Sequence, residues 1–305
     1  MGNVKNIAIS ILDAKDKNDT LKKIYDASMK IAQMKFENCF NSIIHLDVMD
    51  NKFVPNTGID LECILDAKKY NFFTDLHLMV ENPIGDGFID KALEYGVDSI
   101  TVHYEINDFE NVIKYLSSKN VEVGVAVKPD TDISLLKQYE EYFDKILIMT
   151  VEPGFGGQKY INKCNEKIKL AATSMFKVKK IEIDGGVNEE TIKFGLRNNV
   201  NTFVVGNAFI HSDDYYETLL KFNIIKDIEE LFSKSNTKEL ILAIREISKK
   251  YVKIGCDFEI ISFLMNSKYE EYRSLGNFMI SEIVEQNKEN KEWLGKIKEN
   301  LPNTF

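Results

Sequence analysis

The stretch Met-Thr-Val-Glu-Pro-Gly-Phe-Gly-Gly-Gln occupies residues Met149–Gln158 and ends an apolar run that begins at Lys145. One proline and three glycines in this stretch allow the backbone to turn sharply and to present bare N–H groups to an anion. The combination predicts a buried strand whose carboxyl end opens into a phosphate-binding turn.

Seven more short apolar runs lie along the chain, and each is followed by a longer amphipathic stretch. Strands that alternate with helices imply a parallel sheet, and eight such units in roughly 220 residues predict a closed (β/α)₈ TIM barrel. An open doubly wound sheet is the alternative, but no Gly-x-Gly-x-x-Gly motif follows the first run. The expected strands are Ile7–Leu12, Ser42–Met49, Asp75–Val80, Ser99–His103, Val121–Val127, Lys145–Val151, Lys180–Ile183 and Thr202–Gly206.

Polar side chains gather where several of these runs end, which is where the active site of such a barrel lies. His45, Asp47 and Met49 are spaced by two residues, so all three point toward the barrel axis, and His77 and Met79 repeat the spacing. Histidine nitrogens and aspartate oxygens are ligands that suit Zn²⁺, Fe²⁺, Mn²⁺ or Co²⁺.

Four motifs together resemble the ribulose-phosphate 3-epimerase family, and the likeness runs from about Asn6 to about Phe222. The resemblance implies an isomerase of the pentose phosphate pathway that interconverts D-ribulose 5-phosphate and D-xylulose 5-phosphate. The motifs are His45–Asn56, Asp75–Pro83, Met149–Gln158 and Ile183–Asn188.

The resemblance also assigns one divalent metal ion to His45, Asp47, His77 and Asp184, with Zn²⁺ or Fe²⁺ expected before Mn²⁺ or Co²⁺. Asp47 and Asp184 are the expected catalytic residues as well. Inversion of a carbon beside a ketone needs a base on one face and an acid on the other, because a single base would return the proton to the face it left. Two aspartates from the second and seventh units can approach from opposite sides.

Substrate contacts are expected from the strand ends and from the sixth, seventh and eighth loops. Backbone N–H groups are expected to bind the phosphate, because the motifs place no Lys or Arg there. The methionines also fit as gap-filling core residues, and His103 is an outer-layer or structural candidate. The expected substrate-binding residues are Ser10, Met49, His77, Met79, Met149, Gly154, Phe155, Gly156, Gly157, Gly185, Gly186, Gly206 and Asn207.

Two departures and two rival functions accompany the resemblance. Asn51 stands where a glycine is usual, and asparagine tolerates a left-handed backbone; Asn207 replaces a common serine.

A 3-epimerase of a hexulose 6-phosphate such as allulose 6-phosphate is the nearest rival function. Gly156 and Gly186 favour the pentose, because hexulose enzymes tend to carry Ala and Ser at these positions. A non-catalytic sugar-phosphate scaffold is the other rival, and the complete set of acids and histidines argues against it.

Bulk properties fit a cytoplasmic enzyme that acts on a small sugar phosphate. The chain has 305 residues, 44% of them hydrophobic, and its net charge of −9 disfavours binding to nucleic acids or anionic membranes. Four scattered cysteines predict reduced thiols, and no signal segment is evident at the N-terminus.

Residues 225–305 are expected to form an all-helical extension of unknown role that follows a catalytic domain, residues 1–224. Apolar positions such as Leu240, Ile241, Ile244 and Ile247 recur at helical spacing. An element that packs on the barrel or supports a homo-oligomer is the favoured interpretation.

Overall fold

The computed structural model describes residues 5–32, 42–173, 176, 180–232, 261 and 264–286. The chain divides into two compact units, Met1–Phe222 and Asn223–Phe305. The division into a catalytic domain, 1–224, and a helical extension, 225–305, stays a prediction, because the boundary between the units falls inside one helix.

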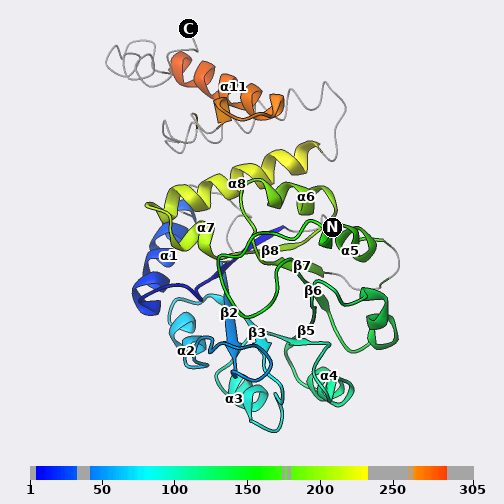
Figure 1. Ribbon diagram of the computed structural model, residues 1–305. Helices are drawn as coiled ribbons and strands as arrows, with labels where there is room; N and C mark the ends of the chain where they lie inside the picture. The colour runs from blue at the N-terminus through cyan, green and yellow to red at the C-terminus, as the bar shows by residue number, and fades with distance from the viewer. Residues whose placement is uncertain are drawn as a thin grey trace. The chain divides into compact units, whose positions relative to one another are not determined.

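The first unit is a TIM barrel, as the sequence predicts, and the open doubly wound alternative is wrong (Figure 1). Eight parallel strands pair in chain order, and the last closes on the first. The strands are β1 (Asn6–Ser10), β2 (Ile43–Met49), β3 (Phe73–Met79), β4 (Ser99–His103), β5 (Glu122–Val127), β6 (Lys145–Met149), β7 (Lys180–Asp184) and β8 (Thr202–Val205).

Helices follow the strands and surround the barrel (Figure 1). In α1 the residues Leu21, Ile24 and Ile31 recur at helical spacing and therefore lie on one face of the helix. All three are buried, so this apolar face packs inward. The fifth connection is a 3₁₀ helix, η1 (Ile133–Tyr139). The helices are α1 (Lys17–Ala32), α2 (Cys63–Lys68), α3 (Phe88–Glu94), α4 (Phe109–Ser117), α5 (Cys164–Ala171), α6 (Thr191–Arg197), α7 (Asn207–Ile210), α8 (Tyr215–Phe232) and α11 (Glu270–Gln286).

The register between strands brings the polar motifs to one end of the barrel. β2 and β3 pair over seven residues, with Asp47 opposite His77 and Met49 opposite Met79. Met149 of β6 is opposite Asp184 of β7. Side chains alternate along each strand, so apolar residues such as Ile44 pack toward the helices while the polar motif residues turn inward.

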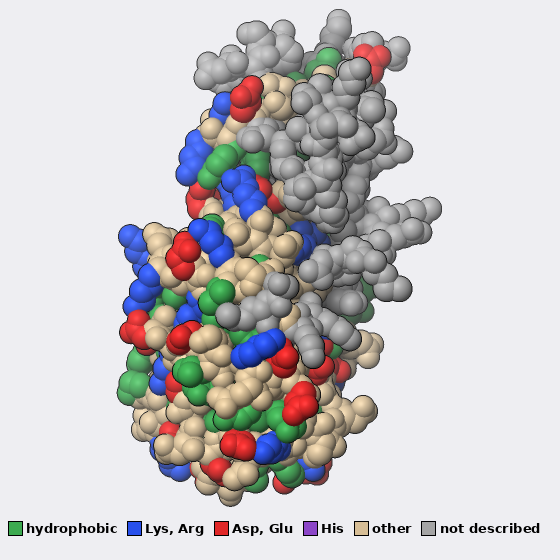
Figure 2. Space-filling model, turned by 90° about the vertical axis from the view of Figure 1, so that its right-hand side faces the viewer, with side chains coloured by type: hydrophobic (Ala, Val, Ile, Leu, Met, Phe, Trp, Pro, Cys, Tyr) green, Lys and Arg blue, Asp and Glu red, His purple; other side chains and the backbone are tan. Residues whose placement is uncertain are grey.

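The outer surface carries charges of both signs. Figure 2 shows Lys and Arg interspersed with Asp and Glu among the described side chains of one face. Pairs such as Lys22 and Asp26, 2.6 Å apart on α1, are exposed and therefore stabilise the fold little. None of the helices in the described ranges has the length and apolar character needed to span a membrane.

The second unit contains the end of α8 and all of α11, which agrees with the expected helical extension. Tyr272 is buried and donates a hydrogen bond of 3.2 Å to the carboxylate of Glu229. Leu275 and Met279 are buried on the same helix as Tyr272. The expected apolar positions from 240 to 247 lie outside the described residues.

Candidate metal centre and active site

Two histidines and two aspartates meet at the carboxyl ends of three strands. The Asp47 carboxylate lies 3.1 Å from His77 Nδ1 and 3.3 Å from His45 Nε2. The Asp184 carboxylate lies 3.7 Å and 3.8 Å from the same two nitrogens. All four side chains offer ligand atoms within 4.8 Å of one another, so the residues predicted as metal ligands are brought together.

The donor set fits a divalent cation. Ligand atoms held about 2.1 Å from a tetrahedral cation lie about 3.4 Å from each other, close to the distances between these nitrogens and oxygens. His45 Nε2 is fully buried and lies 3.3 Å from the Asp47 carboxylate, so this nitrogen can become a ligand once it gives up its proton. Two imidazoles and two carboxylates suit Zn²⁺, Fe²⁺, Mn²⁺ or Co²⁺.

Asp47 and His45 are both held in charged forms. Burial alone raises the pKa of Asp47, but the positive charge of His45 and hydrogen bonds with both histidines outweigh burial and hold this pKa below its usual range. Burial likewise lowers the pKa of His45, but the charges of Asp47 and Asp75 outweigh it and raise the pKa well above 6.5. Without a metal, His45 therefore keeps its second ring proton.

Asp184 and His77 are driven toward their neutral forms. Burial and the nearby charge of Asp47 raise the pKa of Asp184 to about 7. Burial, together with the charge of His103, lowers the pKa of His77 to about 4. The two aspartates thus differ: one is a ready base and the other holds a proton near neutral pH.

A buried ionic cluster supports His45. Its Nδ1 lies 2.9 Å from Asp75, and Lys145 forms ion pairs with Asp75 and with Glu182, the second at 2.6 Å. His45, Asp75 and Glu182 form a second group of potential metal ligands. The Lys145 ammonium already pairs with both carboxylates of this group, so its positive charge takes the place of a metal ion there.

His103 connects His77 to a carboxylate. The two Nε2 atoms of His77 and His103 are 2.9 Å apart, and His103 Nδ1 lies 3.0 Å from Glu105. Glu105 also accepts hydrogen bonds from the backbone N–H of Lys128, at 2.7 Å, and from the hydroxyl of Thr131. Burial raises the pKa of Glu105, but the hydrogen bond and charge of His103 outweigh it and lower the pKa to about 2.

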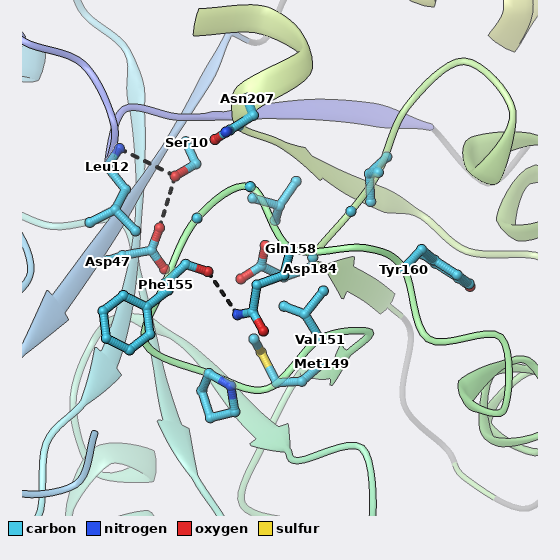
Figure 3. A pocket seen from close by; sticks show the side chains of 18 of the residues that line it. Ser10, Leu12, Asp47, Met149, Val151, Phe155, Gln158, Tyr160, Asp184 and Asn207 are labelled. Atoms are coloured by element: carbon cyan, nitrogen blue, oxygen red, sulfur yellow. Dashed lines mark hydrogen bonds between the residues drawn. The ribbon is translucent and has the colours of Figure 1, made fainter. Parts of the chain in front are cut away.

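A pocket of about 470 Å³ opens above this centre (Figure 3). Its wall includes Asp47 and Asp184, and Ser10 donates a hydrogen bond of 2.8 Å to Asp47. His45 and His77 are fully buried and do not line it, although the sequence predicted that His77 contacts the substrate. The other predicted residues that line the pocket are Met49, Met79, Met149, Gly154, Phe155, Gly156, Gly157, Gly185, Gly186, Gly206 and Asn207.

In this structure the loop after β7 leaves no room for a side chain at Gly186. A Cβ on Gly186 would lie 2.5 Å from the backbone nitrogen of Tyr160, and its φ of +65° is left-handed. Gln158 ties the loop after β6 together by donating to the carbonyl oxygen of Glu152 at 2.6 Å and to that of Phe155 at 2.9 Å. Figure 3 shows the second of these bonds. These contacts hold the turn that the sequence predicted as a phosphate cradle.

The prediction for Asn51 is confirmed, since its φ of 56° is left-handed. Asp50 supports this turn by accepting hydrogen bonds from the backbone N–H groups of Lys52 and Phe53, at 2.8 and 2.9 Å. The side-chain oxygen of Asn207 is buried at the pocket without a hydrogen-bond partner among the described residues.

Several residues of the site were missing from the sequence predictions. Asp75 and Glu182 each precede a predicted ligand by two residues, so their position in the strand already indicated that they point inward. Glu105 lies two residues after His103, but beyond the strand end, where alternation no longer predicts direction. The pocket lining also includes Asp13 and Lys159, which no motif identified.

The chain matches the model of the Ribulose-phosphate 3 epimerase family over residues 6–210. It is 36% identical over 178 residues to the ribulose-phosphate 3-epimerase of Bacillus subtilis, which covers 56% of this chain and 81% of that protein. It is 33% identical over 190 residues to the enzyme of the same name from Eremothecium gossypii, covering 58% and 78%.

A solved structure shares the fold. The 3-hexulose-6-phosphate synthase of Salmonella typhimurium matches with a TM-score of 0.51 at 15% identity, over 72% of this chain and 98% of that chain. At this level of identity the match bears on the barrel alone. The family match, by contrast, spans all eight strands and every residue of the metal centre. The chain therefore belongs to the ribulose-phosphate 3-epimerase family and is an isomerase of the epimerase type.

Proposed function

We propose that this enzyme interconverts D-ribulose 5-phosphate and D-xylulose 5-phosphate with the help of one divalent metal ion, as a step of the pentose phosphate pathway. The observation that carries the proposal is that Asp47 and Asp184, from β2 and β7, share two buried histidines and both line one pocket. Related enzymes that carry the substrate's name support the choice of a ribulose phosphate.

The metal ligands in this proposal are His45, Asp47, His77 and Asp184, with Zn²⁺ or Fe²⁺ preferred over Mn²⁺ or Co²⁺. When bound, the ion supplies positive charge to the ketone and hydroxyl oxygens on which negative charge develops. The two aspartates then have a second task, because they also reach the pocket where the substrate would bind.

The two aspartates act as a base and an acid on opposite faces of carbon 3. One carboxylate removes the proton to give an enediolate, and the other donates a proton to the other face, which inverts the carbon. In the metal-free site the pKa values of the two aspartates are shifted in opposite directions, which fits two carboxyls with different roles. Ser10 restrains Asp47 by its hydrogen bond.

The methionines and the glycine loops bind the rest of the substrate in this proposal. Met49, Met79 and Met149 line the pocket with thioethers, which exclude water without offering a competing proton. Backbone N–H groups of the loops that contain Gly157, Gly186 and Gly206 bind the phosphate.

A coupled assay with D-ribulose 5-phosphate tests the proposal. We expect turnover that is lost in the presence of a chelator and restored by added Zn²⁺ or Fe²⁺. In deuterated water, the product should carry deuterium at carbon 3, because the inverted carbon receives its proton from the second acid. An enzyme that prefers D-allulose 6-phosphate would instead support the hexulose alternative, and absence of turnover with both sugars would support the scaffold alternative.

A further inference from the structure

His77 has both ring nitrogens engaged. Nδ1 faces the carboxylates of Asp47 and Asp184, and Nε2 faces Nε2 of His103 at 2.9 Å. Two ring nitrogens at this distance share one proton, so one donates and the other accepts. Whichever histidine donates here determines where the lone pair of His77 points.

Glu105 determines which histidine donates. Its carboxylate can only accept hydrogen bonds, so the Nδ1 of His103, 3.0 Å away, must carry a proton. A neutral His103 then has its lone pair on Nε2, and it accepts the Nε2 proton of His77. When a metal ion is bound beside Asp47 and Asp184, this leaves the Nδ1 lone pair of His77 available to the ion.

The carboxylate of Glu105 is itself fixed in place. Its second oxygen accepts from the backbone N–H of Lys128 and from the Thr131 hydroxyl. A backbone N–H cannot reverse its role, so this oxygen must remain an acceptor.

The same logic applies to His45 with the nitrogens exchanged. Asp75 accepts from His45 Nδ1 at 2.9 Å, so Nε2 is the nitrogen that binds the metal once its proton is released. The two histidines therefore use opposite nitrogens toward the metal centre. The outer carboxylate of Asp75 contacts His45 directly, whereas the outer carboxylate of Glu105 reaches His77 only through His103.

We propose that Glu105, acting through His103, sets the tautomer of His77 and thereby presents the Nδ1 lone pair to the metal. Glu105 and His103 are positioning residues of the metal centre. This inference rests on the proposed function, since it assumes that His77 binds a metal. Outer carboxylates that orient metal-bound histidines commonly change metal affinity about 10–100-fold when they are removed.

We call the chain of contacts from Glu105 through His103 to His77 the relay. The variant Glu105→Gln tests it because an amide has only one acceptor oxygen. That oxygen must face the fixed N–H of Lys128, so the amide NH₂ faces His103 Nδ1 and requires a lone pair there. His103 would then carry its proton on Nε2, opposite the Nε2 proton of His77. To relieve this clash of two donors, His77 moves its proton to Nδ1 and loses its ligand lone pair.

Nuclear magnetic resonance of the Zn²⁺-loaded full chain, labelled with ¹⁵N in histidine, reads the tautomers directly. The chain has only four histidines, and three of them belong to this site. In the parent protein we expect protons on His45 Nδ1, His103 Nδ1 and His77 Nε2. In Glu105→Gln we expect the His103 proton on Nε2 and Zn²⁺ affinity, measured by chelator competition, to fall about 10–100-fold.

Glu81→Gln is the matched control, because Glu81 accepts a hydrogen bond from the Asn107 side chain and, among the described residues, forms no hydrogen bond or ion pair with a histidine. It should leave the tautomers and the Zn²⁺ affinity unchanged. Thr131→Val removes one hydrogen bond to Glu105 but keeps the carboxylate, so the tautomers should also stay as in the parent.

Three results would overturn the inference. A parent spectrum with the His77 proton on Nδ1 would do so without any variant, which matters if Glu105→Gln does not fold. Unchanged tautomers and affinity in a folded Glu105→Gln would do so while leaving the metal centre intact. A parent protein that binds no Zn²⁺ would overturn both the relay and the proposed metal centre.

Discussion

Asp47 and Asp184 carry the same functional group, but their surroundings give them different protonation states. Asp47 touches two histidines and a serine, whereas Asp184 lies farther from the same histidine nitrogens. Burial is the largest influence on the pKa of Asp184. At the scale of single residues, the chemistry thus depends on differences of less than 1 Å in distance to a charged partner.

We expect Asp47→Asn and Asp184→Asn each to reduce turnover of D-ribulose 5-phosphate by at least about 10²–10⁴-fold, because an amide neither accepts the proton nor binds a cation as strongly. Solvent deuterium exchange at carbon 3 separates the two roles. A variant that keeps one functional acid should still exchange a substrate proton without inversion. Near-normal epimerisation in either variant would contradict the assignment of two acids.

Metal binding should release protons, and their number should depend on pH. The raised pKa of His45 means that it releases a proton over the neutral range, and Asp184 adds a second below its pKa of about 7. Metal affinity should therefore fall as the pH decreases, and more steeply below pH 7 than above it. Calorimetry in buffers of different ionisation enthalpy measures the released protons; a pH-independent count would contradict the assigned states.

At the scale of elements, alternation along strands and glycine-rich turns predict the barrel and most of the pocket lining. β4 begins and ends at the predicted residues, Ser99–His103. The buried ionic cluster could not be predicted in the same way. Lys145 and Glu182 appear as charged residues at or near strand starts, and only the closed barrel shows that β3, β6 and β7 bring opposite charges together. The pairing depends on strand order, which no single strand encodes.

The loop after β7 offers a test of the glycine cradle. Gly186→Ser should raise the KM for the sugar phosphate by about tenfold or more, because the added Cβ meets the Tyr160 backbone 2.5 Å away in a left-handed conformation. Gly96→Ser is the matched control. Its φ of +75° is also left-handed, but a Cβ there meets nothing within 4 Å.

The control should lose about 1 kcal/mol of unfolding free energy from backbone strain while keeping the KM of the parent. Steady-state kinetics and chemical denaturation of both variants measure the two effects. If Gly186→Ser and Gly96→Ser had the same KM, the loop after β7 would not bind the phosphate.

At the scale of the whole molecule, the catalytic parts are concentrated in the first unit. The pocket is lined by residues from Ser10 to Ala208, and the candidate metal ligands come from β2, β3 and β7. A homo-oligomer and a cytoplasmic location stay predictions. The sequence predicted the helical character of the extension but not its role, because a helical pattern specifies which face is buried and not what that face contacts.

Removal of residues 233–305 should leave a folded and active epimerase. Helix α8 continues to Phe232, so a cut after that residue keeps the whole helix, whereas a cut near Lys226 would divide it. All described residues that line the pocket are retained. We expect kcat/KM within about threefold of the full chain, which corresponds to less than about 1 kcal/mol of transition-state stabilisation.

The cost of this truncation should appear in solubility or assembly. Glu229 loses the hydrogen bond from Tyr272, and apolar surface buried within the second unit becomes exposed to solvent. Static light scattering of both proteins, with metal content and kinetics measured on the same samples, separates assembly from chemistry. A soluble, metal-loaded truncation without activity would show that the extension closes over or binds the substrate, because no residue of the described pocket would have been removed.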